Sequence, residues 1–131
     1  MSLTLEAVDR AYAFLKDRVR RTPVEESAEL SRRLGVPVWL KLESLQITGS
    51  FKLRGALFRL SLLNESERRL GVATCSAGNH GKAIAYAAKQ LGVRARVYVP
   101  RSVDESKRLA ILGLGAELIV SEFDGYDDTE A

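Results

Sequence analysis

The chain has 131 residues, enough for one ordinary domain. A hydrophobic fraction of 46% and a charged fraction of 28% are typical of a water-soluble globular protein. The net charge of +3 comes from small basic groups that have acidic residues nearby and few aromatic residues between them, which favours a solvated surface over a nucleic-acid interface.

The sequence also limits the compartment in which we expect the protein. It has one cysteine, Cys75, so an intrachain disulfide is excluded and a reducing compartment is favoured. Residues 1–6 lack the basic region and apolar run of a signal peptide. No stretch approaches the roughly 18 consecutive apolar residues of a membrane span. We therefore expect a cytoplasmic protein with no membrane partner.

The N-terminal half is predicted to contain two helices, a strand and a third helix. Apolar residues recur at steps of three and four, which indicates one face of a helix that begins after Thr4: Leu5, Val8, Tyr12, Leu15 and Val19. Thr22-Pro23 ends this helix, because the residue before proline avoids helical dihedral angles. The expected elements that follow are a helix over 27–34 stopped by Gly35, a strand over 38–42, a loop over 44–50 and a helix over 51–63.

The C-terminal half alternates strands with helices. Strands are expected over 72–76, 95–99 and 117–120, and helices over 83–91 and 104–112. Residues 126–131 have the acidic composition of the first turn of another helix. This alternation is typical of βαβ units, so we expect an α/β fold with a parallel sheet. Because no helix body or returning strand follows, we also expect the chain to be a piece of a longer protein.

One segment with chemical potential is TGSFKLRGA, residues 48–56. Lys52 follows a glycine loop and lies in the first turn of a predicted helix, where free backbone N–H groups and the helix dipole favour anions. The same positive end disfavours a protonated ammonium, which would make Lys52 a usable amine nucleophile for an aldehyde. Taken alone, a lysine on an ordinary surface helix explains the segment more simply.

A second segment is CSAGNHG, residues 75–81, between a predicted strand and helix. Small residues allow the backbone to approach a ligand closely, and the helix start supplies donors to a carboxylate or phosphate. Asn79 offers both a donor and an acceptor. A glycine-rich turn with no ligand explains this segment equally well when it is taken alone.

Together the two segments resemble the threonine dehydratase/serine racemase family of pyridoxal-phosphate enzymes, of fold type II. SFKLRGA at 50–56 is similar to the family's Schiff-base lysine motif, and SAGNHG at 76–81 is similar to its substrate-carboxylate loop. RTPV at 21–24 and KLESLQ at 41–46 resemble the family's N-terminal segments. The similarity covers essentially the whole chain and implies pyridoxal 5'-phosphate as the cofactor.

The resemblance implies a role for each matching residue. Lys52 would form the Schiff base with the cofactor and act as the acid and base at the substrate Cα. Asn79 would hydrogen-bond the cofactor's phenolic oxygen, and Phe51 would pack beside its pyridine ring. The substrate carboxylate would be held, chiefly through backbone groups, by the loop: Ser76, Ala77, Gly78, Asn79 and His80.

Three positions narrow the resemblance to a branch of the family. Leu53 follows the lysine where threonine synthases and cysteine synthases usually carry Asp, and His80 lies where cysteine synthases usually have Thr. Both residues are similar to those of the dehydratase branch. Ala77 stands where serine racemases place the serine that acts as their second acid and base. The resemblance therefore implies elimination in preference to racemisation.

By this resemblance, 1–64 would be the N-terminal segment of a large cofactor domain, and 65–131 would be most of a small domain that closes on substrate. The complete enzyme would deaminate L-threonine or L-serine to a 2-oxo acid and ammonia, as a homo-oligomer in the full-length parent. The family's glycine-rich phosphate loop lies further along the chain and is absent from this sequence. We therefore expect the 131 residues alone to be inactive.

Two classes of alternative are open at this point. The chain could be a structural or interaction module that retains the motifs without catalysis, and whose acidic end and sheet edge pair with another chain. It could instead be a small α/β domain that binds an anion or a nucleotide. Within the resemblance itself, serine racemase-type activity is the alternative to a dehydratase.

Several other residues are expected to have no catalytic role. His80 is the only histidine, so no histidine-based metal cluster and no metal site are expected. Cys75 is predicted to be an inert thiol in a buried strand, and Trp39 a core residue of its strand. Lys41 is expected at the solvent or a domain seam, and Lys107 on a surface helix.

Overall fold

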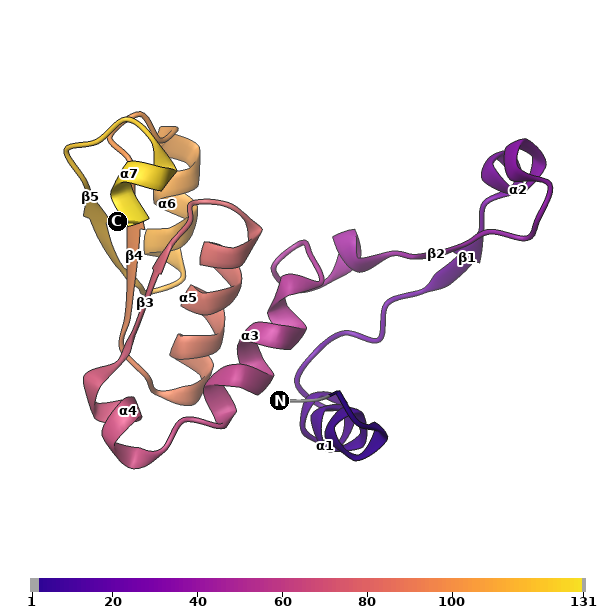
Figure 1. Cartoon of the computed structure of the whole chain (residues 1–131), viewed down its shortest axis with the longest axis horizontal. Helices are drawn as coiled ribbons and strands as arrows, with labels where there is room; N and C mark the ends of the chain where they lie inside the picture. Colours follow the sequence, from indigo (N-terminus) through magenta and orange to yellow (C-terminus); the bar gives the residue numbers. More distant parts are fainter. Residues whose placement is uncertain (1–2, 131) are drawn as a thin grey trace.

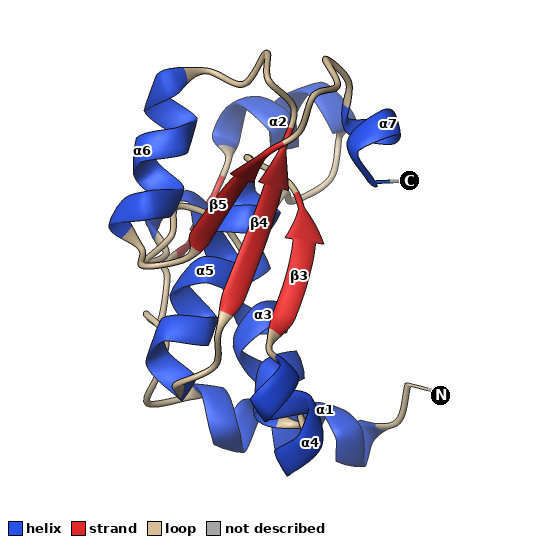
Figure 2. Cartoon of the chain, turned by 90° about the vertical axis from the view of Figure 1, so that its left-hand side faces the viewer, coloured by secondary structure: helices blue, strands red, loops and turns tan. Residues whose placement is uncertain are grey.

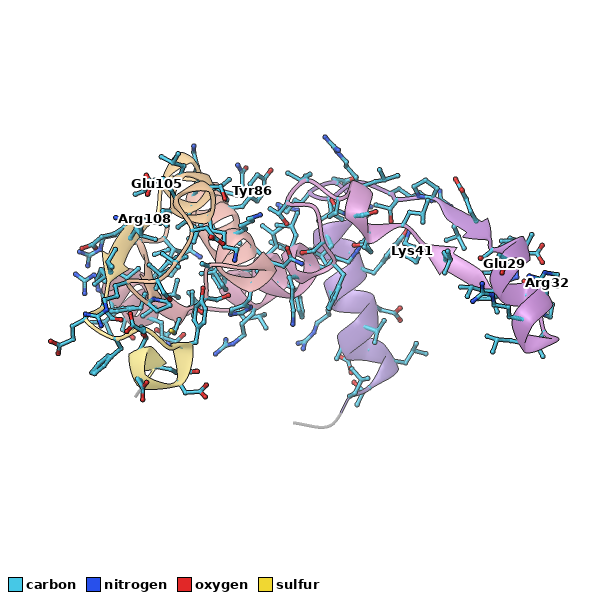
Figure 3. All side chains as sticks on the ribbon, turned by 90° about the horizontal axis from the view of Figure 1, so that it is seen from above. Glu29, Arg32, Lys41, Tyr86, Glu105 and Arg108 are labelled. Carbon is cyan, nitrogen blue, oxygen red and sulfur yellow. The ribbon has the colours of Figure 1, made fainter. Side chains whose placement is uncertain are left out.

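The structure, a computed structural model, describes residues 3–130 and consists of a body and a projecting arm (Figure 1). The arm contains β1 (Val24–Glu26), α2 (Ala28–Leu34) and β2 (Trp39–Lys41), with β1 and β2 paired antiparallel. Figure 3 shows Glu29 and Arg32 together at the far tip of the arm and Lys41 on β2 nearer the body. The body contains all the other helices and strands of the described residues.

A three-stranded parallel sheet forms the centre of the body (Figure 2). Its strands are β3 (Val72–Cys75), β4 (Ala95–Val99) and β5 (Glu117–Val120), in the order β3-β4-β5. Two helices connect them, α5 (Asn79–Leu91) and α6 (Glu105–Gly113). The predicted α/β fold with a parallel sheet of βαβ units is therefore confirmed.

The two faces of the sheet have different neighbours. Val97 and Val99 of β4 are fully buried and belong to the core cluster with the apolar residues of α5. Tyr98 lies on the other face because side chains alternate along a strand, and its register partner is Cys75. The Cys75 thiol lies 3.7 Å from the carbonyl oxygen of Tyr126, the first residue of α7 (Tyr126–Glu130). α7 therefore packs on the face opposite to α5.

The remaining helices of the body support this sheet from one side. α3 (Lys52–Ser61) packs along α5, and α1 (Leu5–Leu15) packs on α3. Buried leucines of α3 meet an alanine-rich face of α5, so the two helices share one core: Leu53, Leu57 and Leu60 with Ala83, Ala87 and Ala88. In Figure 1 both helices begin at the upper end of the body and end near α4 (Glu65–Leu70). Their N-termini therefore lie at the same end of the body.

Three elements were not predicted from the sequence: α4, β1 and the short 3-10 helix η1 (Glu43–Leu45). α4 lacks apolar periodicity, and it forms because Asn64 and Glu67 make a capping box at its start. β1 is only three residues long, and it exists through its pairing with β2. The strand at Trp39–Lys41 is consequently part of this antiparallel pair instead of the parallel sheet.

Some predicted boundaries and one predicted core residue were wrong. α1 ends at Leu15 instead of continuing to Val19, although Thr4 caps it as expected. α5 begins at Asn79, four residues earlier than predicted. Trp39 is 59% exposed, because nothing within residues 3–130 covers either strand of the arm. The expected turn at 126–131 is helical over Tyr126–Glu130, and Ala131, like Met1 and Ser2, lies outside the described residues.

None of the helices within residues 3–130 has the length and apolar character needed to cross a bilayer.

Replacing Leu57 with alanine tests the packing of α3 against α5. Leu57 is 1% exposed, whereas Leu62, directly after the same helix, is 50% exposed. We expect Leu57→Ala to lower the free energy of unfolding in urea by about 2–5 kcal/mol, and Leu62→Ala by less than about 1 kcal/mol. Equal losses in the two variants would contradict the buried interface between α3 and α5.

Candidate active site

The N-termini of α3 and α5 share an unusual electrostatic feature. Neither helix has an acidic residue in its first turn, and neither has a side chain that caps it. The other long helix of the N-terminal half, α1, has both, in Glu6 and Thr4. The free N–H groups and the positive dipole ends of α3 and α5 are therefore not neutralised by the chain itself. Because both ends lie on the same side of the body, they favour an anionic ligand there.

Lys52 is the first residue of α3. The turn that precedes it requires Gly49, whose φ of 75° lies in the left-handed region that favours glycine. Lys52 is exposed, and its Nζ lies 5.1 Å from the ring centroid of Phe51. Among residues 3–130 no carboxylate forms a salt bridge with it. The amine is thus accessible and lies beside an aromatic ring.

The segment 76–81 forms a tight connection between β3 and α5. The Ser76 hydroxyl accepts a hydrogen bond from the Gly78 N–H at 3.3 Å, and Ala77 is fully buried in the core. Asn79 and His80 are exposed in the first turn of α5, where the sequence predicted loop. A methyl group on Gly81 would lie 1.8 Å from the Ser76 carbonyl oxygen. Only glycine therefore allows α5 to start this close to the strand.

Two buried hydroxyls just before Lys52 in the chain have no hydrogen-bond partner among residues 3–130. Ser50 is 6% exposed, and within the described residues neither its Oγ nor the Oγ1 of Thr48 makes a hydrogen bond. A buried hydroxyl without a partner carries a free-energy cost of about 1–3 kcal/mol, which a ligand with acceptor oxygens relieves. Both residues flank Gly49 at the start of α3. Together with the accessible amine and the unneutralised helix ends, these donors fit an anionic aldehyde such as pyridoxal phosphate.

An ion-pair network that the sequence analysis missed supports the start of α3. The Arg54 guanidinium makes two hydrogen bonds to the Glu43 carboxylate, at 2.9 and 2.7 Å, and the Thr22 hydroxyl donates a third at 2.5 Å. The Arg54 bonds, with a smaller contribution from Thr22, lower the pKa of Glu43 to about 2. Spacing along the sequence gives no signal for this network, because its members come from three separate segments. Lys41 also joins it, donating to the Thr22 carbonyl at 2.6 Å.

Lys107 and Tyr126 lie beside the start of the 76–81 segment. Lys107 is exposed, as expected, and pairs with Asp104 at 2.9 Å. With Tyr126 it borders a hollow of about 400 Å³ that also reaches Cys75, Ser76 and Gly78. Cys75 is partly instead of fully buried, and burial, with a smaller contribution from Glu130, raises the pKa of its thiol. Such a thiol is a poor nucleophile.

Within residues 3–130 no group of three or more His, Cys, Asp or Glu side chains could hold a metal ion.

Comparison with known proteins identifies the class. A family described as pyridoxal-phosphate dependent enzymes matches residues 15–131, so the chain belongs to this family, as the sequence motifs predicted. Among curated relatives, the L-threonine ammonia-lyase of Thermotoga maritima is 42% identical over 118 residues, which cover 90% of this chain and 29% of the relative. The serine racemase of Schizosaccharomyces pombe is 40% identical over 125 residues, which cover 95% of this chain and 38% of the relative.

Solved structures give the same result. Serine racemase from Dictyostelium discoideum matches with a TM-score of 0.87 and 35% identity over 98% of this chain and 41% of the other. The processed form of threonine deaminase isoform 2 from Solanum lycopersicum matches with a TM-score of 0.81 and 30% identity over 98% of this chain and 37% of the other. The chain thus spans only about 30–40% of the length of these relatives.

Adding a methyl group at Gly81 tests the close approach of α5 to Ser76. The clash with the Ser76 carbonyl should displace the segment 76–81 and lower the free energy of unfolding by about 1–3 kcal/mol. Gly55→Ala is the matched control, because Gly55 is also helical and its added methyl group meets nothing within 4 Å. That variant should gain about 0.4–1 kcal/mol. Urea unfolding measures both, and a shift of the same sign in both variants would count against the close approach.

Proposed function

We propose that the complete protein containing this chain is a pyridoxal-phosphate dependent ammonia-lyase that deaminates L-threonine or L-serine to a 2-oxo acid and ammonia. The observation that carries the proposal is the position of Lys52, an accessible amine at the uncapped N-terminus of a helix. That helix runs beside α5, whose equally uncapped N-terminus begins with Asn79. Relatives named as L-threonine ammonia-lyases support the choice of reaction.

Each candidate residue has a proposed task. Lys52 holds the cofactor and then, as a free amine, removes the proton from the substrate Cα. Asn79 hydrogen-bonds the cofactor's phenolic oxygen, and Phe51 lies beside its ring. The backbone of residues 76–80, which has free N–H groups at the start of α5, holds the substrate carboxylate: Ser76, Ala77, Gly78, Asn79 and His80. When bound, pyridoxal phosphate supplies an electron sink for the electron pair left at Cα.

We further propose that the two halves of the chain belong to different domains. Residues 1–64 belong to a larger cofactor domain, and residues 65–131 form most of a smaller domain that closes on the substrate. Since the chain is about a third the length of its relatives, the 131 residues alone lack part of the site and are inactive. We also propose that the complete protein is a cytoplasmic homo-oligomer whose partner molecule is an amino-acid substrate.

Serine racemase activity is the second candidate, because several relatives carry that name. Racemisation requires a second acid and base that returns a proton to the opposite side of Cα. Ala77 stands where the resemblance places that group, and its methyl side chain cannot carry a proton. Ala77 therefore favours elimination.

Replacing Lys52 in the full-length protein tests the proposed function. Borohydride reduction should link pyridoxal phosphate to Lys52, and Lys52→Ala should abolish both the link and ammonia release from L-threonine, with a loss in kcat of at least about a thousandfold. Lys89→Ala is the control, because Lys89 is exposed in the last turn of α5. A Lys52→Ala enzyme with normal turnover would refute the proposal, and ammonia release by the 131 residues alone would refute their inactivity.

Introducing a hydroxyl at position 77 tests the preference for elimination. In the full-length protein we expect Ala77→Ser to increase D-serine formation from L-serine relative to pyruvate formation by about tenfold. Chiral chromatography measures D-serine, and a coupled assay measures pyruvate. The native protein should form little D-serine. If it forms D-serine as fast as pyruvate, Ala77 does not decide between the two reactions.

A further inference from the structure

We propose that Glu43 and Arg54 are a positioning pair for Lys52: their ion pair sets the direction of the first turn of α3 and so the place of the lysine amine. The inference rests on the proposed cofactor role of Lys52. Neither residue is predicted to touch the cofactor or the substrate. Both act through the backbone that carries the lysine.

The first step is the geometry of the pair. Arg54 lies two residues after Lys52 in α3, which places the two side chains roughly 200° apart around the helix. The guanidinium therefore holds one side of the helix while the lysine projects from the other. Two parallel hydrogen bonds join Arg54 to Glu43, Nε to Oε2 at 2.9 Å and Nη2 to Oε1 at 2.7 Å. A bidentate contact of this kind fixes orientation as well as distance.

The second step is that the carboxylate is itself held in place. The Thr22 hydroxyl donates to Glu43 Oε1 at 2.5 Å, and Arg54 Nη2 also reaches the carbonyl oxygen of Arg20 at 3.3 Å. Thr22 is 4% exposed, and the Glu43 side chain is 13% exposed. The carboxylate is therefore largely shielded from solvent, the Arg54 side chain is 32% exposed, and both are anchored to residues 20–22, so the pair differs from a mobile surface ion pair.

The third step is the loop between the pair and Lys52. Gln46 is 3% exposed, and its side-chain amide accepts from the Arg20 N–H at 2.9 Å and donates to the Arg20 carbonyl at 3.0 Å. The loop over 47–51 is thus tied at both ends to the segment 20–22 that precedes β1, through Gln46 before it and through Arg54 and Glu43 after it. Thr48 and Ser50 within the loop have buried hydroxyls with no partner among the described residues. The two ties therefore determine how the loop presents Lys52.

A small displacement of the Lys52 amine is expected to lower the rate of catalysis. A displacement of about 1 Å at a reacting group can cost on the order of a hundredfold in rate. Loss of one anchor at Glu43 would release α3 on the side opposite the lysine and let the first turn tilt. Lys52 would remain accessible but would meet the cofactor aldehyde in a poorer geometry.

The test uses the full-length protein with pyridoxal phosphate and the variant Glu43→Gln, which keeps the side-chain shape and removes the charge. Borohydride trapping at Lys52 is measured by mass spectrometry relative to trapping at Lys89 in the same digest. We expect the Lys52 to Lys89 ratio to fall about tenfold or more, and kcat for L-threonine to fall while KM changes little. General unfolding would also lower this ratio, so circular dichroism and urea unfolding must show that Glu43→Gln keeps the native fold before its ratio is interpreted.

Glu117→Gln is the matched control. Glu117 pairs with Arg96 at 2.9 Å on the sheet, and both residues lie outside the network around Lys52. In the Glu117→Gln variant, the Lys52 to Lys89 trapping ratio and kcat should stay within about twofold of the native values. If Glu43→Gln behaves like Glu117→Gln, the positioning role is wrong while the cofactor role of Lys52 stands. If native Lys52 is trapped no better than Lys89, the cofactor role is wrong and the positioning role with it.

Two further variants keep the test informative if Glu43→Gln does not fold. Arg54→Lys keeps the positive charge but only one hydrogen bond, so its trapping ratio should lie between those of the native and Glu43→Gln proteins. The double variant Glu43→Arg with Arg54→Glu restores an ion pair of reversed sense and should recover at least half of the native ratio. A native ratio in Arg54→Lys, or no recovery in the double variant, would contradict the role of the pair.

Discussion

The parallel packing of α3 on α5 is the constraint on which the candidate site depends. Large leucines of one helix fit a face of the other that is built almost entirely from alanine, so the two axes approach closely and start at the same end. Had either helix run in the opposite direction, its negative end would have faced the other's positive end. The packing therefore brings the positive N-termini of α3 and α5 to one end of the body, where an anion such as the phosphate group of an aldehyde cofactor is favoured.

The arm shows the opposite situation, because its structure lacks a core within the described residues. β1 and β2 are exposed along their whole length, and α2 buries no residue. A two-stranded ribbon by itself is marginally stable at best in water. Trp39, Leu34 and Val36 are all more than half exposed.

The sequence predicted the elements whose signals are local. The succession of strands and helices from residue 72 was predictable, because apolar runs, glycine stops and helical periodicity coincide there. The motifs around Lys52 and Asn79 predicted the family. Trp39 was misjudged because the apolar pattern of its strand gives no sign that the strand pairs only with β1 in an exposed arm. The Glu43 and Arg54 pair and the shared direction of α3 and α5 depend on contacts between distant segments, which spacing does not encode.

The position of α7 restricts where a further strand could pair with the sheet. β3 is an outer strand, and α7 crosses the face opposite to α5 to reach it. Connections between parallel strands are almost always right-handed, so any strand that follows α7 in this sheet is directed to the free side of β3. The strand order would then reverse at β3, and open α/β sheets form their ligand crevice where the order reverses. The turn that begins at Ser76 would lie at the opening of that crevice, with polypeptide backbone on both sides of it.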